Sequence, residues 1–430
     1  MSIRDCALRS QAFAALKDVY DHRETAAARW RADGGKVVGE LGCDVPDEFI
    51  LAAGMLPVRV YAEVEKPLAE TDKYLEYAFD PVVRAQFEKI VDGTYDRQID
   101  ALAISNSTDV IIRIYLYLRE LRRVEPEKPV PPVEFIDWLF TRNRLHQVRN
   151  EQTLELFRQT VERWAGRAIT DEEIAAAGAI CNENRQALRE MAALRRCAQP
   201  RITGSEALVI IGSAFFMERS AHTALVRQVV ADAQSWPVLN GPRVFFTGSN
   251  QEDTALYEQI EAAGAVIVGE DYDWGDRWYD RDYNPEYSPV RAVVDRYMLR
   301  EFSSKKAFVS QRVAALDREV DASLSGGEVK RIEIATILAR KSGLMIFDEP
   351  EAGIDLWSFA KLTETFRAIH QKREATLIVI SHQERIIDLA DEIVMIRDGK
   401  IAKHGPKDEI FPQILANTSA GCSYMSEGAR

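Results

Sequence analysis

Cysteine and positive charge are both scarce in this sequence, and each shortage excludes a class of protein. Five cysteines occur among 430 residues and none forms a C-x-x-C pair, so neither a disulfide framework nor a zinc ribbon is indicated. Lys and Arg number 55 against 68 Asp and Glu, which gives a net charge of −13. Because nucleic-acid phosphates are bound by clustered Lys and Arg, we expect no nucleic-acid partner.

Long apolar runs and phosphate-binding glycine loops are also missing. The longest apolar run, residues 207–216, falls short of the about 20 residues that span a bilayer, and the first ten residues contain no apolar signal core. We therefore expect a cytoplasmic protein without a membrane span. The loop G-x-x-x-x-G-K followed by Ser or Thr holds nucleotide phosphates. Gly35-Lys36 and Gly399-Lys400 lack its first glycine and its hydroxyl.

Strand-like and helical segments alternate along the chain, which predicts an α/β fold. Apolar strands separated by helices favour parallel sheets covered on both faces. Several strands end in Gly, Ser or Asp, and open α/β sheets bind ligands at this carboxyl edge. Four residues at such ends are candidates for a ligand cleft: Ser213, Ser249, Glu270 and Asp271. The expected strands are residues 57–63, 100–107, 206–213, 243–249, 265–271, 344–349, 376–381 and 392–401.

Polar residues cluster in two further places. Residues 270–277 crowd four carboxylates and one arginine at the end of a predicted strand. These side chains either contact a ligand at a cleft between domains or form a salt-bridged loop, and the sequence leaves both alternatives open. Asn182, Asn184 and Arg185 lie in a predicted helical region, where we expect them to make polar contacts between helices.

Six segments of the first 315 residues resemble one protein family. They are GELGCDVPDEFILAAGMLPVRVYAE (39–63), AISNSTDVIIRIYLYLREL (103–121), FIDWLFTRNRLHQVRNEQ (135–152), ICNENRQALREM (180–191), ITGSEALVIIGSAFF (202–216) and VIVGEDYDWGDRWYD (266–280). Their order and spacing resemble the 2-hydroxyacyl-CoA dehydratase and benzoyl-CoA reductase family. The resemblance implies two doubly wound α/β domains with inserted helices and lyase activity on an acyl-CoA substrate. It also implies a second dehydratase-family subunit, a separate ATP-dependent activator and a 4Fe–4S cluster.

The cysteines match this family in part. Three cysteines of a subunit hold the cluster in many members, and Cys43 matches the first of them. Thr108 and Asp109 stand where the second is expected, and the segment that carries the third is replaced by other sequence. Hydroxyls are poor ligands for iron, which favours thiolates in such clusters. Cys43 is therefore either a cluster ligand, completed by a partner, or a small buried apolar residue.

The last hundred residues resemble a different family. The segments LSGGE (324–328), LMIFDEPEAGID (344–355) and LIVISHQE (377–384) are similar to those of ATP-binding-cassette (ABC) ATPases, especially the iron–sulfur-assembly (Suf) type. The resemblance implies ATP and Mg²⁺ as ligands and two catalytic residues, Glu349 and His382. It implies six nucleotide-binding residues: Ser325, Gly326, Gly327, Glu328, Asp348 and Asp355. Because the phosphate-binding loop is missing, we expect independent ATP hydrolysis to be very weak.

Together these patterns predict two doubly wound parallel-sheet domains with a helical insertion, and a C-terminal part supplied by a partial ABC ATPase segment. That segment either adds strands to the sheet of the second domain or forms a separate lobe. We expect a dehydratase-family subunit impaired in cluster binding and in ATP hydrolysis. The alternative is an ABC-type protein that binds or hydrolyses ATP, or a nucleotide-responsive interaction protein that uses its signature loop in trans. The expected domains are residues 1–200, 201–316 and 317–416, followed by a flexible tail at 417–430.

Overall fold

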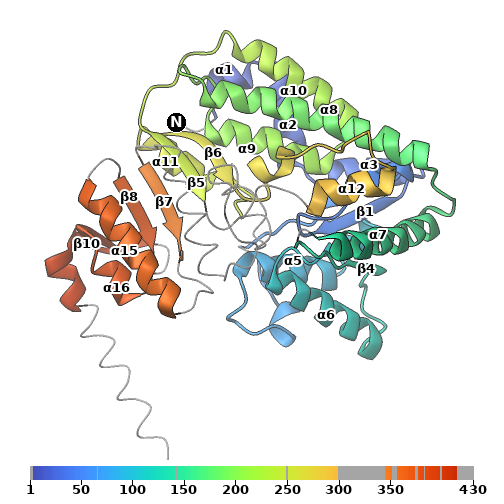
Figure 1. Ribbon diagram of the computed structural model, residues 1–430, viewed down its shortest axis with the longest axis horizontal. Coiled ribbons are helices and arrows are strands. Elements are labelled where there is room, and N and C mark those ends of the chain that lie inside the picture. The colour runs from blue at the N-terminus through green and yellow to red at the C-terminus, as the bar shows by residue number, and fades with distance from the viewer. Residues whose placement is uncertain are drawn as a thin grey trace, which may run out of the picture. The chain divides into compact units, whose positions relative to one another are not determined.

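The computed structural model describes most of the chain, which divides into two compact units, Met1–Leu324 and Ser325–Arg430. Each unit is described by itself (Figure 1). The described residues are 3–64, 66–141, 143–247, 250–298, 344–350, 356–372, 376–381, 383–397 and 400–413.

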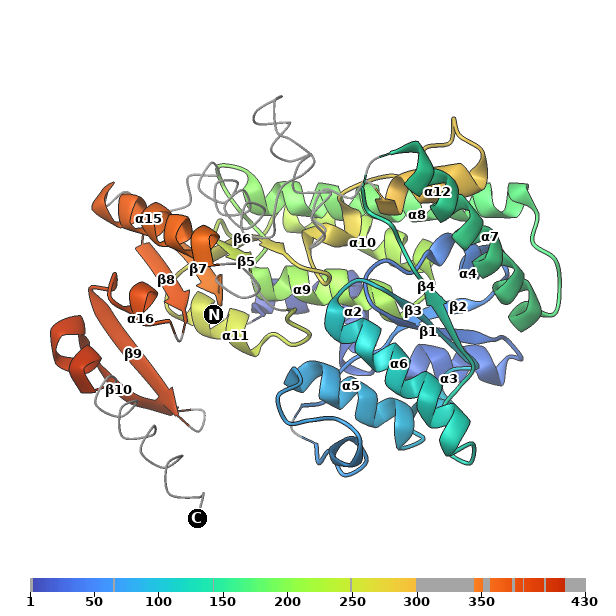
Figure 2. The same cartoon turned by 60° about the horizontal axis from the view of Figure 1, so that its bottom comes forward.

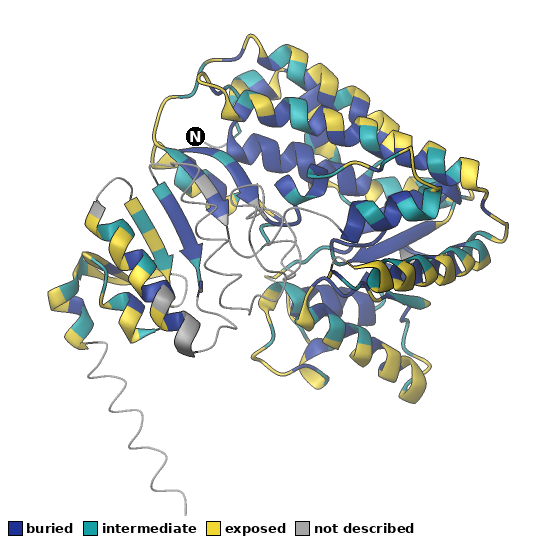
Figure 3. Ribbon diagram, viewed as in Figure 1, coloured by how far each residue is buried: buried dark blue, intermediate teal, exposed yellow. Residues whose placement is uncertain are grey.

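A parallel four-stranded sheet lies at the centre of the first unit. Its strand order is β2-β1-β3-β4, and every neighbouring pair is parallel. All residues of β1 and β3 are buried (Figure 3). Strands β2 and β3 match expected segments, whereas β1 and β4 were not predicted. The strands are β1 (Val37–Leu41), β2 (Leu56–Arg59), β3 (Ala101–Ser105) and β4 (Val133–Ile136).

Helices cover both faces of this sheet through two separate apolar clusters. One cluster joins the sheet to α4, α7, α8 and α12 and includes Phe49 and Phe157. The other joins it to α3, α5 and α6 and includes Phe87 and Leu118. Figure 2 shows α5 and α6 on the opposite side of the sheet from α7 and α12. The predicted α/β fold is therefore confirmed. The helices are α3 (Thr25–Ala32), α4 (Asp47–Ala52), α5 (Pro81–Val91), α6 (Asp109–Val124), α7 (Arg144–Ala165), α8 (Asp171–Arg196) and α12 (Pro289–Met298).

One predicted strand, residues 206–213, is wrong because this segment is helix α9 (Gly204–Ser213). Every residue of α9 is buried, and a short apolar run does not distinguish a buried strand from a buried helix. The local signal for a helix is the capping box of Thr203 and Glu206, in which each side chain bonds the other residue's backbone N–H. Thr170 and Glu173 begin α8 in the same way.

The rest of the first unit contains a second parallel pair of strands, β5 (Arg243–Thr247) and β6 (Val266–Asp271), as expected from the sequence. Helix α11 (Ala255–Ala262) connects them. The other elements among the described residues of this unit are α1 (Asp5–Leu8), α2 (Gln11–Asp21), α10 (Arg219–Ala233) and the 3₁₀ turns η1 (Thr71–Lys73), η2 (Tyr95–Arg97), η3 (Ala214–Phe216) and η4 (Asp276–Tyr279).

The second unit contains two strand pairs among its described residues. Strands β7 (Leu344–Asp348) and β8 (Thr376–Ile380) are parallel, and helix α15 (Leu356–Lys372) lies between them in sequence. The predicted strand 392–401 is instead a hairpin of β9 (Glu392–Arg397) and β10 (Lys400–Pro406), preceded by α16 (Glu384–Ile387). That this segment extends the sheet of the second predicted domain stays a prediction. Within the described ranges, no helix has the length and apolar character to cross a membrane.

Candidate functional site

The carboxyl edge of the four-stranded sheet brings the loops after β1 and β3 together. Gly42 follows β1 with φ +95°, and a Cβ at this position would lie 2.4 Å from Ser107 Oγ and 2.5 Å from Ser105 Oγ. The backbone N–H of Asp44 donates to Ser105 Oγ at 3.2 Å. Cys43, between Gly42 and Asp44, is buried. The candidate cysteine therefore lies in a loop that packs against two serines.

These residues do not fit a 4Fe–4S cluster. The hydroxyl of Thr108 accepts the Ile111 N–H at 3.3 Å and caps α6. Cys181 lies in α8, where burial raises the pKa of its thiol, and Cys197 Sγ donates to the carbonyls of Leu194 and Gln199. In the part of the chain that the structure describes, no three His, Cys, Asp or Glu side chains are grouped to hold a metal. A cluster of this kind needs thiolates.

Four buried charged side chains lie at the same edge, and we call them the Arg59 network: Glu40, Asp47, Arg59 and Arg219. Each is at most 5% exposed. Glu40 and Arg59 are register partners on β1 and β2, with Arg59 Nε 3.9 Å from Glu40 Oε2. Arg219, the first residue of α10, donates through Nε to Asp47 Oδ2 at 3.1 Å and through Nη2 to the same oxygen. No local sequence pattern indicated this network.

The pKa values of the two carboxyl groups in the Arg59 network are shifted in opposite directions. Burial, and then the Asp47 carboxylate, raise the pKa of Glu40 well above its usual range. Burial alone would raise the pKa of Asp47 as well, but Arg219 and a hydrogen bond from Glu40 lower it below its usual value. Because two adjacent buried carboxyls rarely ionise together, Glu40 is the more readily protonated of the two, and Asp47 is the carboxylate that pairs with Arg219.

A second group of buried polar side chains joins α8 to α4 and α10, which confirms the polar contacts expected between helices. Arg185 Nη2 donates to Glu48 Oε1 at 2.6 Å, which joins α8 to α4. Asn182 Oδ1 accepts from Arg185 at 2.9 Å. Asn184 Nδ2 lies 2.7 Å from His222 Nδ1 on α10, and burial lowers the pKa of His222 to about 3. His222 is therefore neutral and serves this contact.

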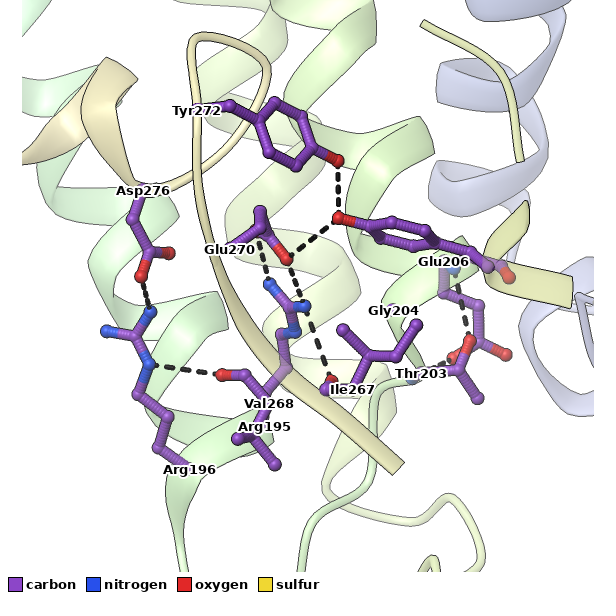
Figure 4. A network of polar contacts seen from close by, with 12 residues as sticks. Arg195, Arg196, Thr203, Gly204, Glu206, Ile267, Val268, Glu270, Tyr272 and Asp276 are labelled. Carbon is purple, nitrogen blue, oxygen red and sulfur yellow. Dashed lines mark hydrogen bonds and ion pairs between the residues drawn. The ribbon is translucent and has the colours of Figure 1, made fainter. Parts of the chain in front are cut away.

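The acidic loop after β6 is held by ion pairs within the first unit (Figure 4). Arg195 of α8 donates to both oxygens of Glu270, at 2.9 and 2.6 Å. Asp276 accepts from Arg196 and from the Tyr279 hydroxyl, the latter at 2.5 Å. These contacts match the salt-bridged alternative for residues 270–277.

Other candidate cleft residues are scattered. Ser213 is the last residue of α9, and its hydroxyl donates to the Ile210 carbonyl at 2.9 Å. Asp271 is the last residue of β6. Ser249 lies outside the described residues.

A further contact joins the loop after β5 to the loop after β2. Glu252 accepts the Ala62 N–H at 2.6 Å and Gln86 Nε2 at 2.9 Å. Burial raises the pKa of Glu252. The Glu252 carbonyl also accepts from the Tyr20 hydroxyl at 2.7 Å. Sequence reasoning missed this residue because its partners are distant along the chain.

In the second unit, the two expected acids stand at the carboxyl end of β7. Asp348 is half-buried and Glu349 is exposed. Glu349 has φ +40°, and its N–H donates to the Ile380 carbonyl of β8 at 2.9 Å. A positive φ is uncommon outside glycine, so this turn is shaped by its hydrogen bond. The remaining cassette candidates lie outside the described residues: Ser325, Gly326, Gly327, Glu328, Asp355 and His382.

Known proteins match this chain in two different ways, of which the first covers most of it. A family model described as 2-hydroxyglutaryl-CoA dehydratase, D-component, matches residues 43–324. The beta subunit of (R)-phenyllactyl-CoA dehydratase from Clostridium sporogenes is 25% identical over 243 residues, which are 55% of this chain and 62% of that protein.

The second match is to cassette proteins over a smaller part of the chain. The uncharacterized ABC transporter ATP-binding protein MJ0035 of Methanocaldococcus jannaschii is 42% identical over 95 residues, 22% of this chain and 38% of that protein. A solved ATP-binding cassette of an ABC transporter in its ADP conformation is 21% identical, with a TM-score of 0.23, and the match covers 29% of this chain and 50% of that one. The chain thus spans less than two thirds of each of these relatives.

Proposed function

Because this chain belongs to the 2-hydroxyglutaryl-CoA dehydratase D-component family, we propose that it is a subunit of a 2-hydroxyacyl-CoA dehydratase-like complex that holds no 4Fe–4S cluster by itself. The observation that carries the proposal is the surroundings of Cys43. Its loop packs against Ser105 and Ser107, and the hydroxyl of Thr108 caps a helix. Thiolates hold such clusters, and hydroxyls replace them here.

In this proposal the chain is the structural partner of a complete subunit. A second dehydratase-family subunit would bind the cluster and the acyl-CoA substrate, and an ATP-dependent activator would supply the electron. The Glu270–Arg195 and Glu48–Arg185 ion pairs support a rigid scaffold, because buried polar groups that are hydrogen-bonded to each other restrict a fold to one arrangement. The C-terminal cassette segment is proposed to contribute no ATP hydrolysis of its own.

The proposal is tested by anaerobic purification of the full chain, alone and with a co-expressed second subunit. Iron and acid-labile sulfide are measured on the wild type and on Cys43→Ser. We expect far less than four irons per isolated chain, and the same value for both proteins. Four irons and four sulfides on the isolated wild type, lost in Cys43→Ser, would refute the proposal.

A second candidate function is a nucleotide-dependent interaction in trans. It is favoured by the 42% identity to a cassette protein and by the acids Asp348 and Glu349 at the end of β7. The signature segment 324–328 would face nucleotide held by another chain, because glycine-rich backbone binds anions. The test is binding of a fluorescent ATP analogue to the chain alone, to an intact cassette ATPase and to their mixture, with Ser325→Arg as the variant. Binding in the mixture that is tighter than that of either protein alone, and that is lost with Ser325→Arg, would support this function. Binding equal to the sum of the two separate proteins would refute it.

A further inference from the structure

Arg59 is a buried cation whose Nε has no hydrogen-bond partner among the residues that the structure describes. The side chain is 5% exposed. The nearest carboxylate oxygen, Glu40 Oε2, lies 3.9 Å from Nε, which is beyond hydrogen-bond distance. A buried charge without a close partner is costly, and such groups commonly mark a bound ion or water. The residues that the structure describes therefore leave Nε of Arg59 without a hydrogen-bond acceptor.

Aromatic rings surround Arg59 without satisfying its donors. Its Cζ lies 4.6 Å from the ring centroid of Phe215 and 5.7 Å from that of Trp278. Such cation–π contacts are worth about 0.5–2 kcal/mol, but a ring face does not replace a carboxylate oxygen. Arg219 lies 5.1 Å from the same Trp278 ring, and its buried Nη1 also lacks a partner in the described chain. Within the described residues, Arg59 and Arg219 thus each have an unpaired guanidinium N–H, and both side chains lie near the Trp278 ring.

No carboxyl group of the described residues lies within hydrogen-bond distance of Arg59 Nε. Asp47 pairs with Arg219 through Oδ2, and burial raises the pKa of Glu40, which favours its neutral form. Glu40 Oε1 and Asp47 Oδ1 are buried without a hydrogen-bond partner among these residues. Glu252 accepts from Ala62 and Gln86. While Glu40 is neutral, the Arg59 network has two cations and one anion, and the uncompensated charge lies on Arg59.

We propose that Arg59 binds a small oxyanion, a carboxylate or a phosphate group, at the carboxyl edge of the first sheet, with Nη1 of Arg219 as a second donor. The planar fork of a guanidinium matches two oxygens of either group. Open α/β sheets bind their ligands at this edge. The site goes beyond the proposed function, since it requires neither a cluster nor a partner subunit.

The test measures the melting temperature of the full chain in increasing concentrations of sodium acetate, sodium phosphate or sodium chloride. The three salts are compared at matched ionic strength. The proteins are the wild type, Arg59→Met, and Arg122→Met as a matched control, because Arg122 is an exposed arginine on α6. We expect acetate, phosphate or both to raise the melting temperature of the wild type and of the control along a saturating curve. Arg59→Met should need at least ten times more anion, or show no response. The effective anion identifies the ligand class.

Three results would overturn the proposal. The first is an equal response of Arg59→Met and the wild type, and the second is an equal effect of chloride; both mean an adventitious ion only. The third comes from Glu40→Gln. If the wild type does not respond but Glu40→Gln does, Arg59 is only the counter-ion of an ionised Glu40. Under the proposal Glu40→Gln binds the anion at least as well as the wild type.

A second variant covers the case in which Arg59→Met does not fold. Arg59→Lys keeps the charge and loses the planar fork, and anion binding is followed by tryptophan fluorescence, with Trp278→Phe identifying the signal. The proposal predicts that Arg59→Lys binds at least several-fold more weakly than the wild type. Equal affinity of the two proteins would overturn it.

Discussion

Replacing Glu40 by glutamine should make the protein less sensitive to rising pH. Burial raises the pKa of Glu40 well above its usual range, so the folded chain keeps a proton that the unfolded chain loses from about pH 4.3 upward. Glutamine has nearly the shape of the protonated acid, and its amide can donate to Asp47 as the acid does. The substituted amide carries no titrating proton, so its burial costs the same at every pH.

The sign and size of the effect follow from proton linkage. Between the unfolded and folded pKa values of Glu40, unfolding releases one proton, so the free energy of unfolding falls as pH rises. The slope is about 1.4 kcal/mol per pH unit. The variant lacks this slope, so its stability relative to the wild type should increase by about 1.4 kcal/mol per unit through the window and then level off. Titrating groups that do not interact with Glu40, such as Glu252, occur in both proteins and cancel in the difference.

The assay is urea unfolding of both proteins at pH 5.5, 6.5, 7.5 and 8.5 in chloride buffer. Tryptophan fluorescence reports mainly on the first unit, because of the seven tryptophans only Trp357 lies beyond Leu324. A stability difference that is constant across this range would show that Glu40 is ionised in the folded protein. The raised pKa of Glu40 would then be refuted, and with it the neutral partner of Arg59.

The remaining predictions concern stability and are measured by urea unfolding at pH 7. Gly42→Ala should lower the free energy of unfolding by about 2 kcal/mol or more, because the added Cβ would clash with two serine hydroxyls. Gly34 also has a positive φ, +84°, but open space around it, so Gly34→Ala should lower this free energy clearly less. Equal losses in the two variants would contradict the packing argument. Arg195→Met should cost about 3–5 kcal/mol because Glu270 stays buried without its partner, whereas Arg123→Met, on the surface, should cause no measurable change. Thr108→Ala should lower the free energy of unfolding by about 1 kcal/mol because the cap of α6 is lost. Thr108→Ser keeps the hydroxyl and should lose much less stability. Equal losses in the two variants would show that the cap is not the cause.

Local sequence patterns predicted those elements whose signals are local. Strands β2, β3, β5, β6, β7 and β8 follow from apolar runs bounded by turn residues. Strand β1, VVGEL, was not predicted because Glu40 interrupts a short apolar run. Glu40 is buried beside Asp47 and Arg219, which are not its neighbours in sequence. Helix α9 was mistaken for a strand because burial on all sides removes the helical period that an amphipathic helix shows.

The sequence indicated which types of residue gather at the candidate site, but not which of them pair with each other. The crowded acids at 270–277 were visible in the sequence, yet their main cation, Arg195, stands 75 positions before Glu270. Asp47 and Arg219 are 172 positions apart. Charge pairs at such separations leave no periodic trace, so a sequence read alone leaves the ligand-binding and structural alternatives open. The structure resolves the Glu270 contact into an ion pair that is almost wholly buried.

The hydroxyls near Cys43 make hydrogen bonds that a substitution to cysteine would disturb. Ser105 Oγ accepts the Asp44 N–H, and Thr108 Oγ1 caps α6. A cysteine at position 108 would supply a second thiol but weaken this cap, because a thiol is a poor hydrogen-bond acceptor. A third thiolate would still be needed. Because a cysteine at position 108 would weaken the cap of α6 without completing a set of thiolates, hydrogen bonds rather than metal ligation hold this edge.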